Sequence, residues 1–162
     1  MLLRALVLLA VAAAPLAAQA DDHLTTQTAP DGTTAEIVRD EFGVPHIYAT
    51  TETGAFYAQG FAVAQDRLFQ METFWRVATG RMAEIMGPDA LGTDQAIRTV
   101  FYTPAERADQ FDALPAEVRS MLDAYIAGIN AYIDRTEADP DTYLPFEYTQ
   151  FPLNLGPIER WD

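Results

Sequence analysis

Hydrophobic positions between Tyr57 and Arg76 follow the period of an α-helix. They recur at steps of three and four residues, at Tyr57, Phe61, Ala64, Leu68, Met71 and Trp75. Other large apolar side chains flank this stripe, so we expect the helix to be buried on most sides. Thr51 is a suitable N-cap and Gly80 a suitable stop. Asp66 and Arg67, in the middle of the helix, are costly there unless each is paired or hydrogen-bonded.

A second long helix is predicted after Pro115. Its apolar stripe consists of Val118, Met121, Leu122, Tyr125, Ile129, Tyr132 and Ile133. Shorter helices are predicted over residues 81–86 and 93–101, and the capping box Thr103–Glu106 starts another. Asp94 and Arg98 stand one turn apart in the favourable order for an ion pair. From Glu137 onward the abundance of proline predicts loops.

Two short segments have the composition of β-strands, Ala35–Arg39 and His46–Ala49. Gly43 lies in the turn between them and is free to adopt a positive φ. The predicted class is therefore α+β, a mostly helical fragment with a short two-strand edge. Because an isolated two-stranded hairpin is marginal in water, we expect these strands to join a larger sheet.

The first twenty residues have the organisation of a secretory signal peptide. Arg4 is followed by an apolar run and then by Ala18-Gln19-Ala20, a small-residue cleavage site. We therefore expect a signal peptide over residues 1–20, a flexible leader over 21–33 and an incomplete helical scaffold over 34–162. The expected location is the periplasm, and an uncleaved membrane anchor is the alternative.

The chain is strongly acidic, with a formal net charge of −14 and no lysine. Nucleic acids and anionic membranes need a basic surface, so neither is expected as a partner. The chain also has no cysteine, and therefore neither a disulfide framework nor a lipoprotein anchor.

The inventory of reactive side chains is short. Ser120 is the only serine, and it lies on the polar side of a predicted helix without a nucleophile-elbow motif. His23 lies in the leader, and His46 is expected to hydrogen-bond a turn. No paired metal-ligand spacing and no glycine-rich phosphate loop is present. These residues do not amount to a catalytic, cofactor-binding or metal site.

Two charged pairs in the first long helix have a structural and a catalytic interpretation. We interpret Asp66–Arg67 and Glu72–Arg76 as structural ion pairs. The alternative is a carboxylate hydrolase built around Asp66. Asn130 and five tyrosines are expected to be polar groups at the edge of the core, namely Tyr48, Tyr57, Tyr102, Tyr125 and Tyr132.

Several segments occur together in an order that resembles a known family. They are residues 37–49 (IVRDEFGVPHIYA), 59–72 (QGFAVAQDRLFQME), 80–87 (GRMAEIMG) and 125–133 (YIAGINAYI). From about Ala35 to its last residue the chain resembles the α subunit of the penicillin acylases.

The resemblance implies a specific architecture and chemistry. Penicillin acylases are exported precursors of the N-terminal-nucleophile hydrolase superfamily, with an αββα core, that cut themselves into an α and a β chain. The nucleophile is a serine at the start of the β chain, and its own α-amino group, which titrates near about 8, acts as base. Their substrates include penicillins and acyl-homoserine lactones. The resemblance also implies calcium in the full-length enzyme.

None of these functional residues transfers to a position in this chain, because the matching segments lie outside it. We therefore expect the N-terminal part of an amidohydrolase precursor, with a β chain and an acyl amide as partners, and no activity from this part alone. An acyl-homoserine lactone acylase is the alternative within the family. The alternative outside it is a non-catalytic exported helical module that binds a partner through exposed apolar faces.

Overall fold

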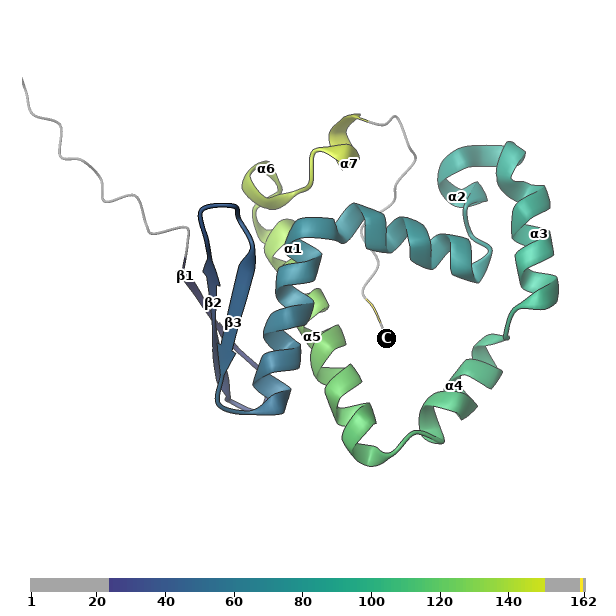
Figure 1. The fold of residues 1–162 in the computed structure, drawn as a ribbon. Helices are drawn as coiled ribbons and strands as arrows, with labels where there is room; N and C mark the ends of the chain where they lie inside the picture. The colour runs from purple at the N-terminus through teal and green to yellow at the C-terminus, as the bar shows by residue number, and fades with distance from the viewer. Residues whose placement is uncertain (1–23, 151–160, 162) are drawn as a thin grey trace, which may run out of the picture.

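The computed structural model describes residues 24–150 and Trp161. Three strands precede the helices (Figure 1): β1 (Leu24–Thr28), β2 (Thr34–Arg39) and β3 (Pro45–Ala49). Two long helices follow, with shorter ones between and after them: α1 (Glu52–Thr79), α2 (Ala83–Met86), the 3-10 helix η1 (Gly87–Ala90), α3 (Leu91–Val100), α4 (Pro104–Asp112), α5 (Ala116–Ala138), α6 (Pro140–Tyr143) and α7 (Glu147–Gln150). The predicted class is confirmed, because the described chain is mostly helical with one small antiparallel sheet.

The sheet has three strands in the order β1-β2-β3, all antiparallel. The sequence predicted only β2 and β3 and assigned residues 21–33 to a flexible leader. Residues Leu24–Thr28 instead pair with β2, from Leu24 opposite Val38 to Thr28 opposite Thr34. The threonine-rich segment suits a strand, and pairing along β2 provides partners for its backbone groups. Gly43 has φ 78°, as predicted for the β2–β3 turn.

Helix α1 begins and ends at the residues that the sequence predicts. The Thr51 side chain accepts a hydrogen bond from the Gly54 N–H, and Gly80 closes the helix with φ 64° and ψ 48°. Near its middle the helix is kinked, where Arg67 has non-helical angles of φ −141° and ψ 17°. The part after the kink is less covered than predicted, since Phe74 is 63% exposed.

Helices α1 and α5 cross with their backbones in contact at two glycines. A Cβ atom at Gly60 would collide with the carbonyl oxygen of Tyr125, and one at Gly128 with that of Tyr57. Any side chain at either position would push the helices apart. The two glycines therefore permit the close approach on which the core depends.

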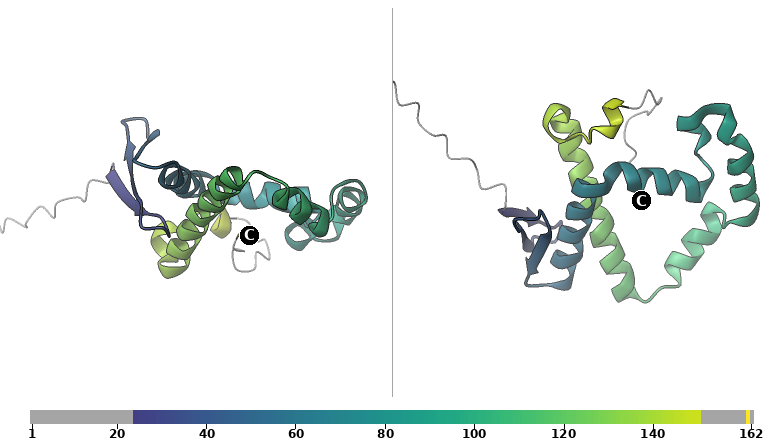
Figure 2. Two further views of the ribbon diagram at one scale, coloured as in Figure 1. Left: turned by 90° about the horizontal axis from the view of Figure 1, so that it is seen from below. Right: turned by 45° about the horizontal axis from the view of Figure 1, so that its top comes forward.

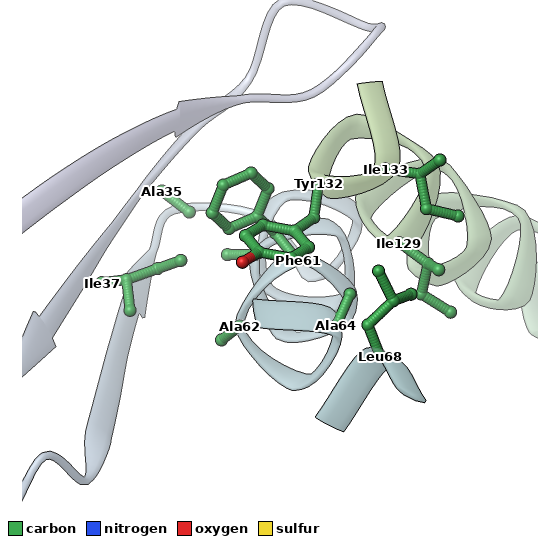
Figure 3. Packing of buried hydrophobic residues seen from close by; sticks show 10 residues of the cluster. Ala35, Ile37, Phe61, Ala62, Ala64, Leu68, Ile129, Tyr132 and Ile133 are labelled. Atoms are coloured by element: carbon green, nitrogen blue, oxygen red, sulfur yellow. The ribbon is translucent and has the colours of Figure 1, made fainter. Parts of the chain in front are cut away.

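The core lies where the first half of α1 meets α5 on one side and β2 on the other (Figure 3). Phe61 and Tyr132 pack edge to face, with ring centroids 5.4 Å apart. The Tyr132 hydroxyl donates to the Tyr143 carbonyl oxygen at 2.9 Å and so ties α6 to α5. The fully buried side chains of the core include Ile37, Leu68, Ile129 and Ile133.

Helices α3 and α4 form an arm, defined here as residues 91–112, that connects the end of α1 to the start of α5. Figures 1 and 2 show the arm arching away from the sheet and the core. No residue of α4 is buried, and within it only Phe111 is even partly covered. The predicted capping box is present, because Thr103 and Glu106 each bond the other's backbone N–H.

The segment after Glu137 is more ordered than predicted. It contains the short helices α6 and α7, where proline content had predicted loops. The proline of α6, Pro140, occupies the first helical turn, where its missing N–H costs nothing, and Asp139 caps that turn. Among the described residues, the longer helices all fall short of the apolar length that crossing a bilayer requires.

Candidate functional site

Asp66 and Arg67, the charged residues at the centre of α1, are not a buried pair. Both are exposed, at the kink of the helix, so the prediction that they pair with each other is wrong. Asp66 instead binds Arg39 of β2, with 2.9 Å between Oδ1 and Nη2. Arg39 also donates to the Gly43 carbonyl oxygen at 2.7 Å. The Asp66 carboxylate therefore joins the hairpin to α1.

The second predicted pair, Glu72–Arg76, is confirmed and is buried. The two side chains are 4% and 5% exposed, and Arg76 Nη1 pairs with Glu72 Oε1. Glu84, beyond the end of α1, lies 3.6 Å from Arg76 Nε. The Tyr148 hydroxyl of α7 donates to Glu72 Oε2. Four residues from three elements thus form one polar cluster, called here the Glu72 cluster, in which Glu72 and Arg76 are buried and Glu84 is exposed.

Tyr148 completes the Glu72 cluster from a distant part of the chain. Its ring packs edge to face on Phe69, with centroids 5.4 Å apart. Burial raises the pKa of the Tyr148 phenol, and the neighbouring Glu72 carboxylate raises it further. The phenol is therefore a donor throughout the physiological pH range, and its role is to satisfy a buried carboxylate.

Asp94 and Arg98 each bind backbone groups of the segment between α1 and α3. They do not pair with each other, so the predicted ion pair is absent. Asp94 is 5% exposed and accepts hydrogen bonds from the Met82 and Ala83 N–H groups at 2.9 Å and 2.8 Å. These are orphan donors at the start of α2. Arg98 Nε donates to the Gly80 carbonyl oxygen at 2.8 Å.

The histidine in the described residues, His46, lies on the exposed edge of the hairpin. Its Nε2 is 3.1 Å from Asp40 Oδ2, and Asp40 also accepts from the Phe42 and Val44 N–H groups of the turn. The hydrogen bond to His46 is the main cause of a lowered Asp40 pKa, and the turn N–H groups add to it. The imidazole therefore supports a turn, as the sequence predicted. His23 lies outside the described residues.

Ser120 and Asn130 occupy different faces of α5. Ser120 is exposed, far along the chain from His46 and Asp40 and on a different element. Asn130 exchanges two hydrogen bonds with the backbone of Trp161, each 2.8 Å long. Among residues 24–150 and Trp161, no group of three or more potential metal ligands is present. The described residues therefore do not fit the calcium that the resemblance implies.

A groove lies between the arm and the second half of α1. It consists of two adjoining hollows of about 480 and 580 Å³, which share Trp75, Pro104 and Arg107. The first is also lined by Ala78, Thr79, Arg81, Ile97, Arg98, Phe101, Tyr102 and Thr103. The second extends to Ala108, Phe111, Asp123 and Ile126. The residues that line the whole groove are thus mainly apolar and aromatic, together with three arginines and Asp123.

These geometries are those of a scaffold. The charged residues of the described chain fix connections between elements, and the contact of the Thr103 hydroxyl with Glu106 belongs to a helix cap. Sequence reasoning missed Arg39 as the partner of Asp66, and Tyr148 as a partner of Glu72. Neither had a local signal, since each partner is 27 or more residues away in the sequence.

Comparison with known proteins gives the same family by sequence and by structure. A family model described as Penicillin amidase matches residues 34–162. Penicillin G acylase of Escherichia coli is 46% identical over 127 residues, which are 78% of this chain and 14% of that protein. Acyl-homoserine lactone acylase PvdQ of Pseudomonas savastanoi pv. phaseolicola is 36% identical over 107 residues, which are 62% of this chain and 14% of that protein.

A solved structure of thermostable penicillin G acylase from Alcaligenes faecalis superposes on the fold with a TM-score of 0.69. The match is 36% identical and covers 79% of this chain and 67% of that one. The chain thus spans about one seventh of the length of the two curated relatives. Since the family model covers most of the chain and the fold agrees, the chain belongs to the penicillin amidase family of amidohydrolases.

Proposed function

We propose that this chain is the N-terminal part of an exported acylase precursor that hydrolyses the amide bond of penicillins or related acyl amides. The observation that carries the proposal is the family match over residues 34–162. The described side chains of this chain pack the core and connect its helices and strands. The charged and hydroxyl groups of the described residues serve helix caps, turns and ion pairs, so the proposal assigns the chemistry to the rest of the polypeptide.

The proposed chemistry is acyl transfer. A serine at the start of a β chain attacks the amide carbonyl, and its own α-amino group takes the hydroxyl proton. An acyl-enzyme forms, the amine leaves, and water releases the acid. The proposal includes a calcium ion in the complete enzyme, bound by residues beyond those described.

A penicillin-type substrate is favoured over an acyl-homoserine lactone by the relatives. Two penicillin acylases are 46% and 43% identical to this chain over 127 and 125 residues, whereas PvdQ lactone acylases are 36% to 39% identical over 103 to 108 residues. The preference rests on overall similarity, since the residues that would contact the acyl group are assigned to the rest of the protein.

The test uses the full-length protein encoded by the gene to which this chain belongs. The purified protein is offered a chromogenic phenylacetyl amide, benzylpenicillin and a long-chain acyl-homoserine lactone. We expect release of the acid from the first two at higher kcat/KM than from the lactone. A folded, processed protein that hydrolyses none of the three would overturn the proposal, and a preference for the lactone would reassign its substrate.

Export and processing need separate measurements. Deleting residues 1–20 should keep the protein in the cytoplasm, while the unchanged precursor is recovered from the periplasm. N-terminal sequencing of the second chain should find serine. Equal recovery from both compartments, or a single uncut active chain, would contradict this part of the proposal.

A further inference from the structure

The arm leaves an apolar surface uncovered within the part of the chain that the structure describes. Val100 is 75% exposed, Phe101 55% and Tyr102 61%, and these three residues are consecutive. Contiguous exposed aromatic and aliphatic side chains beside a groove are typical of a surface that another polypeptide covers. Phe74 on the second half of α1 is exposed as well.

Two arginines of the groove have no carboxylate partner among the described residues. Arg98 uses Nε to hold the Gly80 carbonyl oxygen at 2.8 Å. Arg107 uses Nη1 to hold the Tyr102 carbonyl oxygen at 2.9 Å. No ion pair joins either guanidinium to a described carboxylate, including that of Asp123, which lines the second hollow.

These arginines lack an ion pair although the chain is strongly acidic. The chain carries 24 acidic and only 10 basic residues, yet neither Arg98 nor Arg107 pairs with a described carboxylate. The contacts to backbone carbonyls fix both side chains in place, which lowers the entropy cost of binding a ligand. Their remaining N–H groups are suited to a carboxylate, which a guanidinium can bind through two parallel hydrogen bonds.

We infer that the groove binds an acidic segment of the remaining polypeptide, with Asp or Glu on the two arginines and apolar side chains against Trp75, Phe101 and Tyr102. This rests on the proposed function, which supplies a longer polypeptide. The remaining polypeptide is the favoured occupant because this chain spans only 14% of a relative to which it is 46% identical. A second copy of the chain is disfavoured, since two molecules of charge −14 repel each other.

The first test is photo-cross-linking in the full-length protein. Tyr102 is replaced by p-benzoylphenylalanine, and the cross-linked peptide is identified by mass spectrometry. We expect a peptide from outside residues 1–162 that contains Asp or Glu beside apolar residues. A cross-link confined to residues 1–162, a cross-link to a second copy, or no cross-link in folded protein would overturn the inference.

The second test is charge reversal with rescue. In the full-length protein, Arg107→Glu should lower the melting temperature by at least about 2 °C more than Arg67→Glu, a matched change at an exposed arginine outside the groove. Replacing the acidic residue found by cross-linking with Arg should restore most of the loss in the Arg107→Glu protein. Equal effects of the two reversals, or no rescue, would contradict the inference.

The outcomes separate this inference from the proposed function. If the unmodified full-length protein hydrolyses the phenylacetyl amide but the variant substituted at position 102 gives no cross-link, the proposed function is supported and the groove inference is wrong. A protein that gives the expected cross-link but hydrolyses none of the substrates retains the groove and loses the function.

Discussion

The crossing of α1 and α5 and the arm of α3 and α4 belong to one chain but are stabilised in different ways. At the crossing, backbones touch at Gly60 and Gly128, and the surrounding side chains are almost fully buried. In the arm, nearly every residue is exposed, and the helices are held by caps and by bonds from single side chains.

The contrast shows which part of the fold is stabilised by contacts within the described residues. Burial of apolar surface is the main source of folding free energy, and it is concentrated at the crossing. A capping box contributes about 1 kcal/mol, which does not balance the conformational entropy of a nine-residue helix. The arm therefore needs further buried contacts, which the described residues do not provide. The crossing is stabilised without them.

The largest effect is expected where the two backbones touch. Gly128→Val would place a side chain against the Tyr57 carbonyl oxygen, so it should lower the free energy of unfolding of the full-length protein by about 3 kcal/mol or more. The control is Gly92→Ala in the arm, where a Cβ meets nothing within 4 Å and helix propensity gains about 0.5 kcal/mol. Chemical unfolding measures both, and similar effects would remove the distinction between the two regions.

The Glu72 cluster, which joins the second half of α1 to α2 and α7, gives the next largest effect. Glu72→Gln leaves the buried Arg76 guanidinium without its main counter-charge and should cost about 3 kcal/mol. Glu84→Gln is the matched control, since Glu84 faces the same arginine from an exposed position, and it should cost under about 1 kcal/mol. Both values come from the same unfolding measurements. A larger loss of unfolding free energy for Glu84→Gln than for Glu72→Gln would show that the buried Glu72–Arg76 pair is not the main connection between these helices.

Tyr148 should give the protein a specific sensitivity to alkaline pH. Because burial and Glu72 raise its pKa in the folded state, the unfolded chain releases the phenol proton near its ordinary pKa of 10 while the folded one keeps it. Stability from this group is therefore complete below about pH 10 and falls as the pH rises further.

Tyr148→Phe tests this pH dependence. At neutral pH the substitution should cost about 1.5 kcal/mol, because it removes a hydrogen bond to a carboxylate. Between about pH 9 and 11 it should flatten the decline in unfolding free energy. Tyr48→Phe, at an exposed tyrosine of β3 outside the groove, is the control and should leave that decline unchanged. The same slope in both variants would contradict the assignment.

The smallest effect is expected in the arm. Thr103→Ala removes the capping box of α4 and should cost about 1 kcal/mol, seen as faster hydrogen exchange of amides within that helix only. Thr99→Ala, whose hydroxyl bonds the Gln95 carbonyl oxygen within α3, should have little effect. Faster exchange throughout α5 as well would show that the arm and the crossing unfold together.

Sequence reasoning succeeded where a structure is determined by neighbouring residues. Thr51, Gly80 and the Thr103–Glu106 box were predicted as helix ends because capping depends on residues within one turn. The Glu72–Arg76 pair was predicted for the same reason, since its members are four residues apart on one helix.

Features that depend on distant residues were missed. Strand β1 is stabilised by pairing with β2, and its threonines suit a strand without predicting one by themselves. Arg39 is 27 residues from Asp66 in the sequence, and Tyr148 is 76 residues from Glu72. In the same way, no local pattern predicted that the Asp94 carboxylate would accept hydrogen bonds from the N–H groups at the start of α2.

The two glycines of the crossing follow a common pattern that gives the contact a local two-fold symmetry. Each is preceded three positions earlier by a tyrosine, Tyr57 before Gly60 and Tyr125 before Gly128, and each glycine faces the other helix's tyrosine carbonyl. If α1 slid along α5, a residue with a side chain would replace Gly60 against the Tyr125 carbonyl oxygen. The repeated Tyr-x-x-Gly pattern therefore favours the register in which each glycine lies against the tyrosine carbonyl of the other helix.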